Sequence, residues 1–281
     1  MAPARVIATD LGFAEGPVWT ADGRLLVTSI SHSVIYQIDA DGSHVVAETG
    51  GGPNGMTEGA DGTLYVTQNG GIYGMGDRSL NQAPPGIQAI TGGAVRYLAQ
   101  GLDAPNDCCF GPDGRLYFTD PRGPAQPSSL RPGRVYAMSV DGAPVLLAEG
   151  PAFANGIAFG PDATLLYVAE TFGQRVLVYT VRDGGLGEPE EFCRTEPGFP
   201  DGLCFDAEGR LYVAATLAQE VQAFDAAGQL VERLSCGEGS MPTNCCFGGA
   251  EGRTLFVTDS RGERVLAFDL EAAGLPLFPF R

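Results

Sequence analysis

One pattern of apolar and polar positions recurs six times along the chain. In each repeat, a short apolar run leads into a turn rich in Asp, Gly or Pro, and a second apolar run follows; EGPVWTADGRLLVTS and NDCCFGPDGRLYFTD are two examples. The repeats begin at Glu15, Asn54, Asn106, Asn155, Asp201 and Thr243. Their starts lie about 40 to 50 residues apart, a period typical of β-propeller blades.

Additional short apolar runs extend most repeats, among them SVIYQIDADG, GRVYAMSVDG and ERVLAFDL. The DG, EG and GG pairs between such runs favour tight hairpins, and four antiparallel strands per repeat make one blade. No segment has a long helical period. We therefore predict an all-β chain, a six-bladed β-propeller with four antiparallel strands per blade, as a single domain over residues 1–281.

The two ends of the chain indicate how the ring closes. The last repeat ends after ERVLAFDL, and the apolar segment ARVIAT at residues 4–9 has no repeat of its own. We expect this N-terminal strand to complete the last blade, which would also cover an exposed sheet edge. Two Gly- and Pro-rich segments, 68–102 and 121–132, are expected to be long loops above a binding site.

Composition and charge narrow the range of partners. The 281 residues are 44% hydrophobic, and the formal net charge is −17. Because so acidic a surface repels phosphate backbones, we expect neither nucleic acid nor a membrane as partner. Residues 1–10 contain no long apolar run, and no stretch of the sequence is long and apolar enough to span a membrane, so we expect neither an export signal nor a membrane span. We expect a cytoplasmic monomer or small homo-oligomer, whose seven cysteines are reduced packing residues.

The first position of the six repeats is polar in every case, at the start of an otherwise apolar inner strand. It holds Glu, Asp, three Asn and one Thr. Oxygen donors of this kind suit hard divalent cations, and two carboxylates match a divalent charge. For Asn54 and Thr243, an ordinary turn at the start of a strand explains the residue as well.

Several motifs extend this pattern: AEGPVW at 14–19, PND at 105–107 followed by GRLYFTDP, FANGIAFGPD at 153–162, FPDGLCFD at 199–206 and TNCCFGG at 243–249. In this order and spacing, the chain resembles the gluconolactonase/regucalcin family of metal-dependent propeller lactonases. The resemblance covers essentially the whole chain. It implies hydrolysis of a small-molecule lactone.

The resemblance also implies site residues. It assigns Glu15, Asn155 and Asp201 as ligands of one divalent cation, with Asn106 beside the cation or bound to it. Calcium is the first expectation, with Mg²⁺, Mn²⁺, Zn²⁺ and Fe²⁺ as alternatives. Asp201 is also implied as the general base, and Asp107 is the alternative base.

Substrate contacts are expected from Asn54, Asn106, Tyr73, Arg122 and Phe172. Relatives close to regucalcin carry an Arg two residues before the PND-type Asn, where this chain has Ala104. This difference argues against a strict requirement for a sugar-acid lactone.

Two other functions stay open at this stage. The same ring could support a different metal-assisted reaction, such as phosphotriester hydrolysis or a lyase or isomerase step. A propeller fold alone is also compatible with a non-catalytic protein that binds a protein partner.

Overall fold

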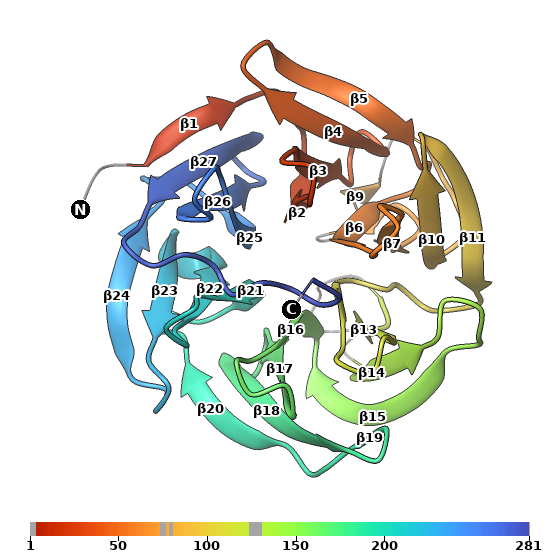
Figure 1. Ribbon diagram of the computed structural model, residues 1–281, viewed down its shortest axis with the longest axis vertical. Helices are drawn as coiled ribbons and strands as arrows, with labels where there is room; N and C mark the ends of the chain where they lie inside the picture. Colours follow the sequence, from red (N-terminus) through yellow and green to blue (C-terminus); the bar gives the residue numbers. More distant parts are fainter. Residues whose placement is uncertain (1–3, 74–76, 79–80, 124–130, 281) are drawn as a thin grey trace.

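A computed structural model of the chain describes residues 4–73, 77–78, 81–123 and 131–280. Six antiparallel sheets stand around a common centre, as in a six-bladed β-propeller (Figure 1). This confirms the predicted fold class. No helix among the described residues is long and apolar enough to cross a membrane.

Each blade contains four principal strands, ordered from the centre of the propeller outward. The first blade comprises β2 (Ala14–Trp19), β3 (Leu25–Ser29), β4 (Val34–Asp39) and β5 (Gly42–Glu48), and the second β6 (Pro53–Glu58), β7 (Leu64–Gln68), β10 (Gly86–Thr91) and β11 (Ala94–Gln100). The third comprises β12 (Cys108–Phe110), β13 (Leu116–Asp120), β14 (Pro132–Met138) and β15 (Val145–Ala152).

The remaining three blades follow the same plan. The fourth comprises β16 (Ala154–Phe159), β17 (Leu165–Glu170), β18 (Arg175–Arg182) and β20 (Glu190–Arg194), with the short β19 (Gly185–Leu186) also paired to β18. The fifth comprises β21 (Pro200–Phe205), β22 (Leu211–Ala215), β23 (Glu220–Phe224) and β24 (Leu230–Ser235). The sixth comprises β25 (Pro242–Gly248), β26 (Thr254–Asp259), β27 (Arg264–Asp269) and β1 (Arg5–Ala8).

The N-terminal strand closes the ring as predicted. Strand β1 pairs antiparallel with β27, placing Arg5 opposite Ala267 and Val6 opposite Leu266. The Arg5 guanidinium also lies 2.9 Å from the Asp269 carboxylate, although this ion pair is exposed. The outer edge of the last blade is therefore supplied by the beginning of the chain, and both ends of the sequence hold one sheet together.

One expectation about the loops is wrong. Residues 86–91 and 94–100 of the segment 68–102 are strands β10 and β11, the third and fourth strands of the second blade. Their sequences, GIQAIT and AVRYLAQ, begin with Gly or Ala and follow a Pro-rich stretch, which disguised them as loop. The extra length lies before them, where β8 (Ile72–Tyr73) pairs with β9 (Asp77–Arg78). In the segment 121–132, residues 124–130 lie outside the described part of the chain.

Apolar side chains fill the space between neighbouring blades. Tyr212 of the fifth blade packs in one buried cluster with Leu255 and Val257 of the sixth, for example. All seven cysteines are present as thiols, and six of them are buried. Because each blade is covered on both faces by its neighbours, every residue of inner strands such as β6 and β16 is buried.

Candidate functional site

Threonine hydroxyls fix the starts of the inner strands. The Thr28 hydroxyl donates a 2.6 Å hydrogen bond to the backbone oxygen of Asn54 in the next blade, and Thr119 donates a 2.7 Å bond to that of Asn155. Three further hydroxyls make the same kind of link around the ring: Thr67 to the backbone oxygen of Asn106, Thr171 to that of Pro200, and Thr243 to that of Ala14. These links position the start of an inner strand from the neighbouring blade.

The second position of each repeat decides what fills the centre. Four repeats have Gly there, whereas the third and sixth have Asp107 and Asn244. A Cβ atom on Gly55 would lie 2.3 Å from the Asp107 carboxylate, and one on Gly202 would lie 2.1 Å from the Asn244 amide. These glycines therefore make room for the two larger side chains, which occupy the middle of the channel.

Three carboxyl groups, those of Glu15, Asp107 and Asp201, lie near one another at the end of the channel where the inner strands start. Burial, followed by the charge of Asp107, raises the pKa of Glu15 to about 8. Burial raises the pKa of Asp107 to about 6. Asp201 has its pKa raised well above the ordinary value, first by loss of hydration and then by the charges of Glu15 and Asp107. Like charges in a poorly hydrated site resist simultaneous ionisation.

Amide side chains supply polar contacts to these carboxyl groups. The Asn155 side chain hydrogen-bonds Asp201, and its amide nitrogen also donates a 3.1 Å hydrogen bond to the Thr171 hydroxyl. The Asn244 side chain hydrogen-bonds Glu15, and its amide nitrogen lies 3.3 Å from an Asp107 oxygen. Asn155 and Asn244 therefore contact all three acids between them.

The donor set fits a divalent cation. Among the ion pairs of the described residues, none involves Glu15, Asp107 or Asp201, so protein cations do not balance these acids. A bound cation would compensate their charge and lower their pKa values. No three His, Cys, Asp or Glu side chains in the described ranges form a ready metal-binding cluster. A metal site at this position therefore needs amide oxygens, such as that of Asn155, beside the carboxylates.

The two asparagines expected to contact substrate lie in the same ring. Asn54 is buried, and its side-chain oxygen has no hydrogen-bond partner among the described residues. Asn106 is 9% exposed, and its backbone oxygen accepts a 2.7 Å hydrogen bond from the Gly55 amide. The uncommitted oxygen of Asn54 is notable, since buried polar atoms are nearly always paired.

The three loop residues expected to line the site have different surroundings. Phe172 packs edge-on against Phe153 and Phe199, with ring centroids 5.7 and 5.2 Å apart. Because Phe153 and Phe199 each precede a ring residue by two positions, this aromatic trio stands beside Asn155 and Asp201. Arg122 is tied to Asp103 and Glu149 by ion pairs of 3.2 and 3.5 Å. The side chain of Tyr73 lies outside the described part.

Sequence reasoning missed Asn244 and the threonine links. Asn244 does not stand out when only the first polar position of each repeat is compared, because Thr243 holds that position in TNCCF. The signal that could have found it is the contrast at the second position, where Asp and Asn replace Gly in two of six repeats. The recurring VT or FT before the end of β3, β7 and β13 likewise indicates three of the threonine links.

The chain is a six-bladed β-propeller that gathers carboxyl and amide side chains at one end of its centre. More specifically, the chain belongs to the SMP-30/gluconolactonase/LRE-like family, whose profile matches residues 13–261. This confirms the family resemblance seen in the motifs.

Known relatives agree with this assignment. The chain is 29% identical over 290 residues to a gluconolactonase of Zymomonas mobilis, covering 92% of this chain and 79% of that protein. It is 27% identical over 272 residues to a pentonolactonase of Haloferax volcanii, covering 94% and 87%. The structure of a gluconolactonase from Xanthomonas campestris superposes with a TM-score of 0.79 at 27% identity, covering 95% of this chain and 90% of that one.

Proposed function

We propose that this protein is a lactone hydrolase that depends on one divalent cation. The observation that carries the proposal is a group of three carboxyls, the buried Glu15 and Asp107 and the partly buried Asp201, to which none of the described Lys, Arg or His side chains is paired. The relatives named as gluconolactonase and pentonolactonase share most of the chain, which supports a cyclic ester as substrate.

The residues proposed to hold the cation are Glu15, Asn155 and Asp201, with Asn106 adjoining them. When bound, such a cation supplies a Lewis acid that polarises a lactone carbonyl and stabilises negative charge on its oxygen. Calcium suits this set of oxygen donors best, because carboxylate and amide oxygens are its usual ligands.

Asp201 is the best placed of the three acids to act as general base. Glu15 and Asp107 are 3% and 6% exposed, whereas Asp201 keeps a partial opening to solvent. Its carboxylate would take a proton from water as the water oxygen bonds to the carbonyl carbon. When the ring C–O bond breaks, the same proton returns to the departing alkoxide. Asn155 holds the Asp201 side chain by a hydrogen bond during both steps.

The surroundings favour a small, uncharged lactone. The trio Phe153, Phe172 and Phe199 gives the site an apolar flank. Ala104 is buried and its backbone amide is bound to Asp120, so it offers no charged group to a sugar acid. An apolar flank and a missing arginine both reduce the advantage of a heavily hydroxylated or anionic substrate.

A lactone panel tests the proposal. Gluconolactone, a simple five-membered lactone and a phosphotriester would be assayed with Ca²⁺, Mg²⁺ and Mn²⁺, using the wild-type chain and Asp201→Asn. We expect hydrolysis of the lactones, at least about a hundredfold slower in the variant. Asp162→Asn, a change in an exposed turn, is the matched control and should be unaffected. Failure to hydrolyse any lactone with any cation, or turnover of the phosphotriester alone, would contradict the proposal.

A further inference from the structure

A cavity of about 390 Å³ occupies the other half of the channel, at the ends of the inner strands. Trp19 follows Glu15 by four positions on β2, so the carboxyl groups and the outer part of this cavity lie about 13 Å apart along the strand. Aromatic side chains from five of the inner strands line it: Trp19, Phe110, Phe159, Phe205 and Phe247.

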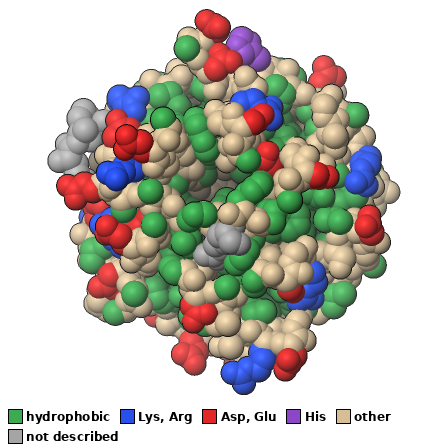
Figure 2. Space-filling model, in the orientation of Figure 1, with side chains coloured by type: hydrophobic (Ala, Val, Ile, Leu, Met, Phe, Trp, Pro, Cys, Tyr) green, Lys and Arg blue, Asp and Glu red, His purple; other side chains and the backbone are tan. Residues whose placement is uncertain are grey.

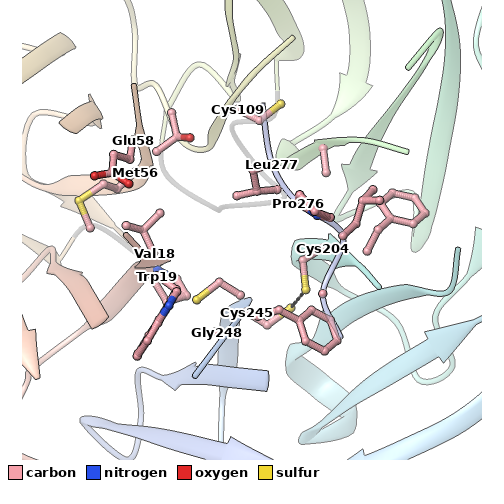
Figure 3. A pocket seen from close by; sticks show the side chains of 18 of the residues that line it. Val18, Trp19, Met56, Glu58, Cys109, Cys204, Cys245, Gly248, Pro276 and Leu277 are labelled. Carbon is pink, nitrogen blue, oxygen red and sulfur yellow. Dashed lines mark hydrogen bonds between the residues drawn. The ribbon is translucent and has the colours of Figure 1, made fainter. Parts of the chain in front are cut away.

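Sulfur-containing side chains complete the wall. Met56, Cys109, Cys204 and Cys245 surround the same space (Figure 3). The Cys204 and Cys245 sulfur atoms are 3.5 Å apart and belong to neighbouring blades. Thioether, thiol and aromatic groups are polarisable and adapt to apolar ligands of irregular shape.

The C-terminal segment lies across the mouth of the cavity. Its course is fixed where the Gly274 amide bonds the Gly252 oxygen at 2.8 Å and the Leu275 amide bonds the Phe205 oxygen at 2.9 Å. From there it crosses the centre of the propeller (Figure 1), and the Phe278 ring packs edge-on against Phe159, 6.1 Å between centroids. Apolar side chains gather around the centre of this face (Figure 2).

Acidic groups at the inner end and on the wall of the cavity select the ligand. Asp107 and Asn244 form its inner end, and the Glu58 carboxylate, which accepts a 2.7 Å hydrogen bond from the Ala21 amide, stands on its wall. The described lining residues include no Lys, Arg or His. An anion entering this space would lose its hydration and meet only acids, whereas a neutral molecule would not.

We propose that this cavity is a second binding site, which takes a neutral, largely apolar molecule of one to three rings. A dry apolar cavity of roughly 150 Å³ already binds benzene, and this one is more than twice as large. The site touches the cluster of carboxyl groups only at its inner end, through Asp107 and Asn244, and it stands whether or not the protein hydrolyses lactones.

A matched pair of dyes tests the ligand class. N-phenyl-1-naphthylamine is neutral, and 8-anilinonaphthalene-1-sulfonate has the same ring system with an added sulfonate. Trp19, the sole tryptophan of the chain, lies in the wall and reports binding by energy transfer to the dye. We expect saturable quenching of Trp19 by one neutral dye per chain, and at least about tenfold weaker binding of the sulfonate. Equal binding of both dyes would overturn the proposal.

Variants place the dye within the molecule. Cys109 lines the cavity, so Cys109→Leu and Cys109→Phe should fill it progressively, with a loss of at least about tenfold in affinity for the neutral dye in the Phe variant. Val145→Phe, on the exposed face of β15, is the matched control. Should Cys109→Phe fail to fold, a smaller loss with Cys109→Leu serves the same purpose. Unchanged affinity in a folded Cys109 variant, or its loss in Phe172→Ala at the other end of the channel, would contradict this site.

Discussion

Asp201 is the side chain on which the proposed chemistry depends most. It is assigned both to the cation and to the proton of the attacking water, and the two roles conflict, because a cation makes a carboxylate a weaker base. Asp201→Asn separates them, since an amide oxygen can still coordinate a cation but cannot accept the proton. We expect kcat to fall about 10²–10⁴-fold while calorimetry still detects bound cation. Near-normal kcat would instead assign the base to Asp107.

Asn244 positions two of the acids. Its side chain hydrogen-bonds Glu15 and Asp107, and hydrogen bonds of this kind favour the ionised carboxylates. The similarly shaped Asn244→Leu removes both contacts. We expect cation affinity, measured by isothermal titration, to fall at least about tenfold at pH 7. Asn244→Gln, which keeps the amide, should lose less; equal affinity in all three proteins would show that Asn244 only fills space.

Individual site residues could be predicted from the sequence where they differ from the residues that a strand normally contains. Glu15 and Asp201 stand out at the start of apolar strands, and the structure brings them together. Asn244 does not stand out, because an Asn beside a Thr is ordinary in a turn. Only the three-dimensional contact with Asp107, 137 positions away in the chain, reveals its place.

In the threonine links, a hydroxyl of one blade hydrogen-bonds the backbone at the start of the inner strand in the next blade. Thr119 lies on β13 and is fully buried, and its hydroxyl holds the backbone of Asn155 on β16. Thr119→Val keeps the shape but leaves a buried carbonyl without its donor. We expect a loss of about 1–3 kcal/mol in the free energy of unfolding, measured in urea, together with weaker cation binding.

Thr164→Val provides the control for this change, because Thr164 is an exposed residue of the turn between β16 and β17, where its hydroxyl donates to the Asp162 carboxylate. This variant should leave cation binding unchanged and should alter the free energy of unfolding by no more than about 0.5 kcal/mol. If both variants behave alike, the threonine links do not position the ring.

Strands were predictable where apolar runs were long and bounded by clear turns. β26 and β27 are runs of this kind. The pairing of β1 with the last blade was predictable for another reason, because the last repeat lacks a fourth strand. β10 and β11 were misjudged because a long insertion separates them from β7, so the periodic spacing was lost. The other strands can be predicted from their distance to the start of a repeat, and an insertion changes that distance.

For the whole molecule, the buried acids make stability depend on pH. Glu15 has a pKa of 4.5 when unperturbed and about 8 in the folded, cation-free protein. Between these values the folded chain holds a proton that the unfolded chain has released, so rising pH favours unfolding by about 1.4 kcal/mol per pH unit for each such group. Asp107 and Asp201 act in the same direction.

We therefore expect the cation-free protein to lose stability steadily from about pH 5 to about pH 8 in urea unfolding experiments. Glu15→Gln should weaken this dependence, and saturating Ca²⁺ should remove most of it, since the cation replaces the proton. Stability that rises over this interval in the cation-free protein would contradict the account of the site.

In the proposed mechanism, lactone hydrolysis requires one cation held by the ring. The most direct test is kcat/KM for gluconolactone after chelation, followed by titration with Ca²⁺ while bound cation is counted. We expect at least about a hundredfold loss of kcat/KM on chelation and full recovery as the first equivalent of Ca²⁺ binds per chain. Undiminished hydrolysis by protein shown to contain less than about a twentieth of an equivalent of any divalent cation would contradict it.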